Sequence, residues 1–545
     1  MDNSSVKRPS RDAEKSGPER EFYRTETIQN GDQMPSVAEE THRGFKPRHT
    51  QMIALGGTIG TSLFLGTGQT LLVGGPAYFI TAYIALSFVI YGVMTGMAEM
   101  ATFHPVAGST MSFYGNKYVS RSLGLAMGYL YWYTLGVLVP YELVASSILI
   151  DYWGSNISPA VWITVILVII VSVNAMPVQY FGEFEFWAAG MKVILIVGLI
   201  ILSIVLFFGG DPTHDALYFR FWKDPGAVNT YIVDDGVGYF ISLLQSFVLA
   251  SFAFVLAPEQ LIVTAGEMQN PRRNLPRAAR RYLWRFIILY IPAVLGISVI
   301  CASDDPMLGK SGASSSPFVI AIKNAKIPVL DSIVNAMIVL SASTAGNAFL
   351  YSSSRNLYSL AVAGNAPAIF KRCNKHGLPY VAVAASASLS VLAYLSLSET
   401  SSSVFTWLIS LTNTSGYLSW MCSGVIYIRY QKTIRYHGLQ PPFRSRVQPW
   451  GMHAGTITST LLLLLNGFTV FFPSKWSAAS FLTSYIGIAA FLCIWLGHRF
   501  YHWSDPWFRR PEDIDMREGL DEALETEHPI PNRSKFLRAI HALYE

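Results

Sequence analysis

Charged residues are scarce in this sequence, since only 14% of its 545 residues are Asp, Glu, Lys or Arg while 51% are hydrophobic. Its mean hydropathy is +0.34. A single soluble core cannot hide that much apolar surface, so the composition excludes an ordinary soluble globular protein. We expect an all-α integral membrane protein that crosses the bilayer many times.

Cysteine is also scarce, with four residues spread over positions 301, 373, 422 and 493. Their spacing matches neither a disulfide framework nor a metal site, so we expect packing residues and predict no metal or other cofactor. The apolar segments also lack a His/Asp/Ser constellation, which argues against a membrane enzyme. The net charge of +5 comes largely from cations placed between apolar runs, and nucleic acid is not a predicted partner.

An apolar block is missing from residues 1–48, which are rich in Ser, Glu, Lys and Arg. This composition predicts a disordered cytoplasmic tail and excludes a cleavable signal peptide, so the first membrane helix must itself direct insertion. We therefore divide the chain into a tail at 1–48, a twelve-helix domain at 49–503 and a cytoplasmic C-terminal tail at 504–545.

Twelve apolar runs of about 20 residues follow the tail. They begin near residues 50, 77, 122, 159, 187, 236, 283, 328, 378, 403, 452 and 476. Lys and Arg gather before the first run and after the sixth, eighth and tenth, so both termini are expected in the cytoplasm. The basic loop at 272–285 is expected to contact anionic lipid headgroups. The loop "NAMPVQYFGEFEFW", between the fourth and fifth runs, departs from this pattern because it holds Glu183 and Glu185 but no cation.

Two of these runs contain helix-weakening residues. In the first run they are Gly56, Gly57, Thr58, Gly60 and Thr61. In the sixth run Pro258 removes an amide donor, and we expect the helix to kink or unwind near 255–258. Breaks five helices apart indicate two inverted five-helix repeats with a substrate site at mid-membrane between the breaks. Close helix packing at the glycines and a structural kink at the proline are the alternatives.

Unwound backbone at mid-membrane is tolerated where its polar groups line a cavity or meet a ligand. The amides of Thr58 to Ser62 would begin a half-helix and attract an anion, a favourable effect of about 0.3–2 kcal/mol. Carbonyls freed in both runs would accept hydrogen bonds from a cation. The simplest ligand with both charges a few ångströms apart is an α-amino acid.

Three ionisable residues lie within the predicted spans, namely Glu142, Lys192 and Glu259. A charge there costs about 2.5 kcal/mol or more, so such groups pair, face water or carry protons. Protonation coupled to transport is one interpretation of all three. The alternatives are a structural hydrogen bond for Glu142, a helix cap for Glu259, and for Lys192 a side chain that reaches the cytoplasmic surface.

Eight segments, in order and with their spacing kept, resemble a known family. They are "RGFKPRHTQMIALGGTIGTSLFLGTG", "AEMATFHPVAGSTMSFYGNKYVS", "VPYELVASSILIDYWG", "FGEFEFWAAGMKVILIVGLIIL", "GEMQNPRRNLPRAARRYLWRFIILYI", "SPFVIAI", "TAGNAFLYSSSRNLYSLA" and "FTWLISLTNTSGYLSW". From about residue 44 to 472 the chain resembles the fungal amino-acid permeases of the amino acid, polyamine and organocation superfamily.

This resemblance implies a proton-coupled amino-acid symporter of the plasma membrane, with two inverted five-helix repeats plus two extra helices, working by alternating access. It places the substrate carboxylate on the helix 1 backbone and the amine near helix 1 and helix 6 carbonyls, with helix 10 as the wall that selects the side chain. The predicted substrate-binding residues are Thr58, Ile59, Gly60, Thr61, Ser62, Glu142, Val255, Ala257, Glu259, Trp407, Thr412 and Asn413, and those predicted for proton coupling are Glu142, Lys192 and Glu259.

The same resemblance implies partners other than the amino acid, protons and membrane lipid. Lys7 and Lys15 in the N-terminal tail are similar to the ubiquitin acceptors that direct endocytosis of such permeases, so ubiquitin ligase adaptors are expected on the cytoplasmic tails.

One stretch departs from the family pattern. Before the helix 6 glutamate, most relatives have a Phe-Ser-Gly-Ser or Phe-Ser-Gly-Thr run, whereas this chain has Val255-Leu256-Ala257-Pro258. We expect this change to stiffen the break and alter the substrate range. Two other functions stay open, an amino-acid sensor with little flux and a transporter of an organic cation such as a polyamine or choline. The sensor commonly has a much longer tail, and the cation would not need the anion-seeking amides of helix 1.

Overall fold

The computed structural model describes residues 60–105, 110–154, 156–176, 178–265, 271–309, 316–374 and 377–516. Helices are the only regular secondary structure within these ranges. The predicted tail at 1–48, the predicted site residues Thr58 and Ile59, and residues 517–545 lie outside the described residues.

The first half of the chain forms α2 (Thr61–Phe64), α3 (Gly66–Phe103), α4 (Met111–Tyr118), α5 (Arg121–Asp151), α6 (Pro159–Asn174), α7 (Val178–Phe207), α8 (Arg220–Lys223), α9 (Gly236–Ser251), η3 (Phe252–Phe254) and α10 (Ala257–Ala265). The second half forms α11 (Pro271–Arg285), η4 (Phe286–Tyr290), α12 (Ile291–Ile300), α13 (Pro306–Gly309), α14 (Pro317–Asn324), α15 (Leu330–Val362), η5 (Ala368–Lys371), α16 (Tyr380–Ser388), η6 (Leu389–Leu397), α17 (Ser401–Tyr436), α18 (Trp450–Leu465), η7 (Phe468–Phe471), η8 (Pro473–Lys475), α19 (Ala478–Tyr501) and η9 (Pro511–Asp513).

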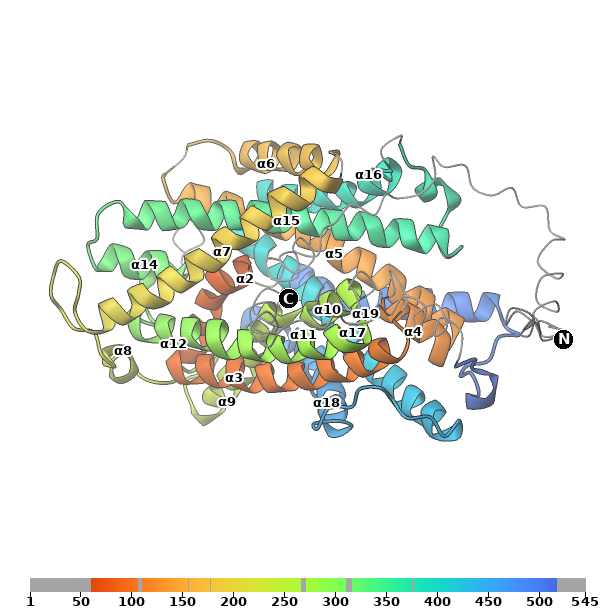
Figure 1. Cartoon of the computed structure of the whole chain (residues 1–545). Helices are drawn as coiled ribbons and strands as arrows, with labels where there is room; N and C mark the ends of the chain where they lie inside the picture. Colours follow the sequence, from red (N-terminus) through yellow and green to blue (C-terminus); the bar gives the residue numbers. More distant parts are fainter. Residues whose placement is uncertain are drawn as a thin grey trace, which may run out of the picture.

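Nine helical stretches of the described chain are long and apolar enough to cross a membrane. The long helices run along a common direction, with α8 and α14 at one end of the bundle and α4 at the opposite end (Figure 1). Helix α5 lies at the centre, because 89% of its most apolar stretch is buried and it packs along α15 and α17. Helix α19 is peripheral, with only 17% of the corresponding stretch buried. This arrangement is typical of a membrane protein, in which the outer helices expose apolar side chains to lipid.

Most helix starts agree with the apolar runs of the sequence. The helices expected near 122, 159, 236, 328, 378, 403, 452 and 476 each begin within two residues of those positions, as α5, α6, α9, α15, α16, α17, α18 and α19. The first two runs are joined in one stretch, in which α3 leaves helical geometry at Gly75, with φ +68. A β-carbon at Gly75 would lie 3.0 Å from the Ala227 carbonyl oxygen, so this close approach requires glycine.

The prediction of a basic loop between the sixth and seventh runs is wrong, because that segment is helical. Helix α11 begins at Pro271 and continues through the π-helical turn η4 into α12. Leu275, Ala279 and Tyr282 lie on its buried stripe, while most of its arginines lie on the rest of the surface. A search for long apolar runs misses such an amphipathic helix, because a helix needs an apolar stripe on only one face to pack against the protein.

The loop expected around Glu183 and Glu185 is also wrong. Helix α7 begins at Val178, well before the predicted start near 187, and Glu185 is fully buried within it. Lys192 consequently lies about four turns into the helix, not one and a half. One face of α7 buries polar groups against the protein, and the other exposes large apolar side chains. The buried polar groups lower the mean hydropathy of its first turns, which is why the sequence placed the helix start too late.

The sixth span is interrupted within 255–258, where the sequence predicts a break. Helix α9 ends at Ser251, the turn η3 follows, and the chain leaves helical geometry at Val255 and at Leu256, with φ +63, before α10 begins. Pro258 is not the cause, because it lies in the first turn of α10, where its missing amide is no loss. The left-handed conformation of Leu256 costs about 1–2 kcal/mol.

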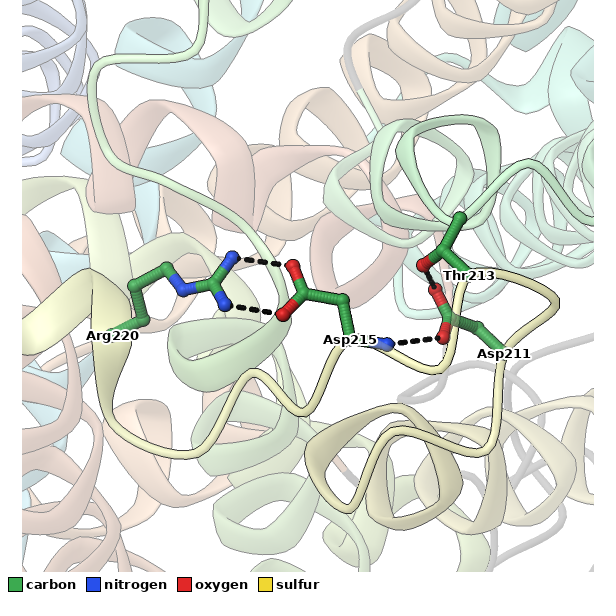
Figure 2. A network of polar contacts seen from close by, with 4 residues as sticks. All are labelled: Asp211, Thr213, Asp215 and Arg220. Carbon is green, nitrogen blue, oxygen red and sulfur yellow. Dashed lines mark hydrogen bonds and ion pairs between the residues drawn. The ribbon is translucent and has the colours of Figure 1, made fainter.

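The loop between α7 and α9 carries an ordered polar network (Figure 2). Arg220 donates through both terminal nitrogens to Asp215, at 2.6 and 2.7 Å, and the Asp215 amide donates to Asp211 at 3.2 Å. The hydrogen bonds from Arg220 lower the pKa of the Asp215 carboxyl. The ion pair is solvent-exposed, so it contributes little to stability.

Part of the predicted C-terminal tail packs against the helices. The Arg509 amide donates to the Val119 carbonyl at 2.8 Å, and Ile514 and Met516 are buried. His104, at the end of α3, donates from Nε2 to the Met516 carbonyl at 3.0 Å, because a carbonyl only accepts. Arg429 of α17 donates to the Arg509 carbonyl. Residues 509–516 are therefore a docked segment that contacts α3, α4 and α17.

Candidate functional site

Glu142 is a buried carboxylate about two-thirds of the way along α5. The Thr61 hydroxyl, in the first turn of α2, donates a hydrogen bond to it. A β-carbon built on Gly60 would lie 3.8 Å from Glu142 Oε1, and one on Gly346 of α15 would lie 3.3 Å from Glu142 Cβ. The Gly60 distance is an ordinary contact, whereas a side chain at Gly346 would crowd Glu142, so glycine at position 346 lets α15 pack closely against α5. The predicted residues Gly60, Thr61 and Glu142 are thus brought together, and the half-buried Ser62 follows them in α2.

Lys192 of α7 is fully buried. Its ammonium group interacts electrostatically with two carboxylates, Glu185 on its own helix and Glu142 on α5. A lysine held there cannot reach the membrane surface, so that alternative is wrong. The cation thus interacts both with the predicted carboxylate and with one that the sequence assigned to a loop.

Glu259 belongs to a different cluster. The Ser419 hydroxyl of α17 donates to Glu259 Oε1 at 2.5 Å, and the Tyr131 hydroxyl of α5 lies 2.7 Å from Ser419 Oγ. Because the Ser419 proton is used on the carboxylate, Tyr131 donates to Ser419. Tyr131 and Glu142 are eleven residues apart on α5, which is about 16 Å along the helix. The structure therefore does not bring Glu142 and Glu259 together.

The predicted residues of α17 differ in what they contact. A β-carbon on Gly416 would lie 3.1 Å from the Val255 side chain, so α17 packs directly on the break. Asn413 donates to the Val248 carbonyl at 3.2 Å and holds the last turns of α9. Thr412 bonds within its own helix. The Trp407 indole donates to Ser480 of α19 at 3.2 Å, away from the Glu142 cluster.

Three aromatic rings pack together beside the break. The Tyr141 ring lies 4.8 Å from Phe252 of η3 and stacks on Phe405 of α17, also at 4.8 Å between centroids. The Tyr141 hydroxyl is buried without a hydrogen-bond partner. This cluster is a buried apolar contact between α5, η3 and α17 that contains one polar group, the hydroxyl of the residue that precedes Glu142 in the chain.

Comparison with known proteins identifies the group to which the chain belongs. Residues 49–506 match the family model described as amino acid permease. The chain belongs to the amino acid permease family.

Individual relatives cover almost the whole chain. A proline-specific permease of Emericella nidulans is 40% identical over 92% of this chain and 93% of its own length. A probable proline-specific permease of Schizosaccharomyces pombe is 43% identical over 87% of this chain and 88% of its own. A dicarboxylic amino acid permease of Saccharomyces cerevisiae is 38% identical over 84% and 77%. The permease is therefore a multi-pass membrane protein for amino-acid transport, and its family consists of transporters rather than enzymes.

Sequence reasoning missed several polar residues around these clusters of the permease. Glu185 is seven residues before Lys192, a spacing that places both on one face of a helix. This spacing indicates a shared buried face only when the helix is known to begin before Glu185. Tyr131 and Ser419 show no such signal, because the partner of each comes from another helix. Only tertiary contacts identify them.

Proposed function

We propose that this permease is a proton-coupled amino-acid symporter of the plasma membrane that imports its substrate by alternating access. Residues 49–503 form the transport domain, and the segments before and after it lie in the cytoplasm. The cations on one set of loops favour this orientation.

The proposed fold has twelve membrane helices in two inverted five-helix repeats plus two extra helices. Gly75 divides the first apolar stretch into two spans, and α6 and α17 add two spans to the nine stretches of the described chain. The first repeat ends with α7 and the second runs from α9 to α17, with α18 and α19 outside it. The break at Val255 and Leu256 supports the scheme, because it interrupts the first span of the second repeat.

The substrate site lies between the start of α2 and this break. The substrate carboxylate accepts hydrogen bonds from amides around Thr58 to Ser62, and the ammonium donates to carbonyls freed in helices 1 and 6. The observation that carries this proposal is the buried Glu142 carboxylate bonded to Thr61 in the first turn of α2. No side chain among the described residues caps the N-terminus of α2.

Proline is the substrate that we propose to test first. Two of the relatives described above are named as proline-specific permeases. A small apolar ring also matches the apolar surroundings of the break, to which Tyr141, Phe252 and Phe405 contribute. Ala257 and Glu259 of α10 form the floor below the break, with Val255 and α17 beside it.

Glu142 and Lys192 carry the coupling proton, whereas Glu259, the third residue predicted for this role, lies in a separate cluster with Ser419. The first two form a buried acid–base pair in contact with the segment that holds the substrate carboxylate. A proton on this pair and a zwitterion at α2 bind favourably together, since both reduce the cost of uncompensated charge in the membrane.

Uptake of labelled amino acids into cells that lack their own permeases tests the proposal. We expect L-proline uptake that is faster at external pH 5 than at pH 7 and that collapses with a protonophore. Competition by amino acids, but not by choline or polyamines, distinguishes this function from transport of an organic cation. Binding without uptake would instead identify a sensor.

A further inference from the structure

Helix α7 has one buried face that includes charged residues. Phe181, Glu185 and Lys192 lie on this face, whereas Tyr180, Trp187 and Ile194 are exposed. Glu185 and Lys192 are seven residues apart, so they share one side of the helix at an axial separation of about 10 Å. Helical side chains lean toward the N-terminus, and the long lysine therefore extends toward Glu185.

Glu185 has few hydrogen-bonding neighbours. Its side chain is fully buried, and neither carboxylate oxygen accepts a hydrogen bond. The Asn347 amide of α15 faces it, and Asn347 accepts a hydrogen bond from Asn174 of α6 at 2.8 Å. A buried carboxylate that has one amide facing it and accepts no well-formed hydrogen bond is costly as an anion. This environment favours a group whose charge changes during a cycle over one that stays ionised.

Aromatic rings separate Glu185 from the nearer end of the bundle. One turn before it, Phe181 stacks on Tyr351 of α15 at 4.3 Å between centroids, and the Arg355 guanidinium lies 4.9 Å from the Tyr351 ring. These rings lie toward the end where α7 begins and α15 ends. In the proposed orientation this is the cytoplasmic end, so the stacked pair lies on the cytoplasmic side of Glu185.

We propose that Glu185 is the inner proton acceptor, which takes the coupling proton from Lys192 and releases it to the cytoplasm. This inference rests on the proposed function. In the transfer, an N–H bond of the Lys192 ammonium breaks and an O–H bond forms on Glu185, which leaves a neutral amine and a neutral carboxylic acid. When Phe181 and Tyr351 separate, the acid gives its proton to cytoplasmic water and becomes a carboxylate again.

The other groups around Glu185 do not provide a competing route among the described residues. Lys192 is the charged group that acts on it. Helix α12, which packs along α7, has no titratable side chain. Helix α15 contributes the amide of Asn347 and, further along, Tyr351 and Arg355. Glu142, on the other side of the lysine, is bonded to Thr61 at the substrate side.

The test compares two transport modes of the purified full-length protein in liposomes, with labelled L-proline as probe. Net uptake driven by a proton gradient requires proton release inside, whereas exchange of labelled for unlabelled L-proline at equal pH does not. We expect Glu185→Gln to keep exchange at the wild-type rate but to slow net uptake about 10²-fold, the usual contribution of a positioned proton-transfer group. Glu185→Asp should restore part of the net uptake.

Glu183→Gln is the matched control, because Glu183 is on the same helix but only half-buried. It should leave both modes unchanged. Unchanged net uptake in Glu185→Gln would overturn the inference, and so would a parallel loss of exchange and net uptake, which would mark Glu185 as structural. Absence of proton-driven uptake in the wild type would contradict the proposed function itself, and this is measured before any variant.

Discussion

The Glu142 and Glu259 clusters are similar in composition but differ in their surroundings. Each is a buried carboxylate that accepts a hydrogen bond from a hydroxyl, Thr61 in one case and Ser419 in the other. Glu142 also faces the buried cation Lys192. Glu259 is enclosed by the neutral groups of Ser419 and Tyr131.

This difference indicates different roles. A carboxylate beside a cation can change its protonation state together with its partner, so it can store and pass on a proton. A carboxylate held only by neutral donors connects helices instead, here α10 to α17 and α5. We therefore expect Glu142 to be required for coupling, and Glu259 to stabilise the geometry of the helix 6 break.

Removal of the Glu142 charge should have the largest effect. Glu142→Gln keeps the shape and a hydrogen-bonding group but cannot exchange a proton with Lys192. We expect proton-driven uptake to fall about 10²-fold or more, while surface expression stays at the wild-type level. Uptake at two pH values and surface labelling measure both quantities. Undiminished proton-driven uptake would remove Glu142 from the mechanism.

A smaller loss is expected at the second cluster. Ser419→Ala leaves the Glu259 carboxylate without its donor, a cost of about 1–3 kcal/mol, so the thermal stability of the purified protein should fall while the pH dependence of uptake is kept. Ser415→Ala, one turn away, is the control, since Ser415 bonds only within its own helix. A change in pH dependence for Ser419→Ala would break the distinction between the two clusters.

His104 is a third buried titratable group, and unlike Glu142 and Glu259 it lies outside the membrane spans. Burial, the main cause, and the nearby Lys117 lower the pKa of His104 to about 4. The native state disfavours the protonated ring. The contribution of His104 to the free energy of unfolding is therefore fully present above its pKa in the unfolded chain, near 6.5. It is lost as pH falls from there toward 4, by about 3 kcal/mol in total.

The docked segment at 509–516 reports this loss, because His104 bonds to Met516. We expect trypsin to cleave at Arg509 or Arg510 faster at pH 5 than at pH 7, after correction for the enzyme's own pH profile. His104→Gln keeps the donor to the carbonyl and should abolish the difference. Equal cleavage at both pH values in the wild type would show that this enclosure does not control the docking of the segment.

Sequence reasoning predicted the membrane class, most helix starts and the position of the break in the sixth span. Each of these depends on a property that is local in the chain, namely the apolar length of a span or the chemistry of a few adjacent residues. The same dependence on local hydropathy made two predicted helix starts wrong. The sequence placed them near 283 and 187, whereas the helices begin at Pro271 and Val178. Arginines on α11 and glutamates on α7 lower local hydropathy although each helix still has an apolar face.

The sequence by itself determined that the chain spans a membrane, that one span is interrupted near Pro258, and that Glu142, Lys192 and Glu259 lie within spans. The tertiary structure alone decided which of these groups meet. It joined Glu142 to Thr61 and Lys192, separated Glu259 from them, and placed Glu185 in a buried face. Spacing along a helix fixes only which side a residue occupies, whereas its partners come from helices far away in the sequence, and the packing of those helices selects the contacts.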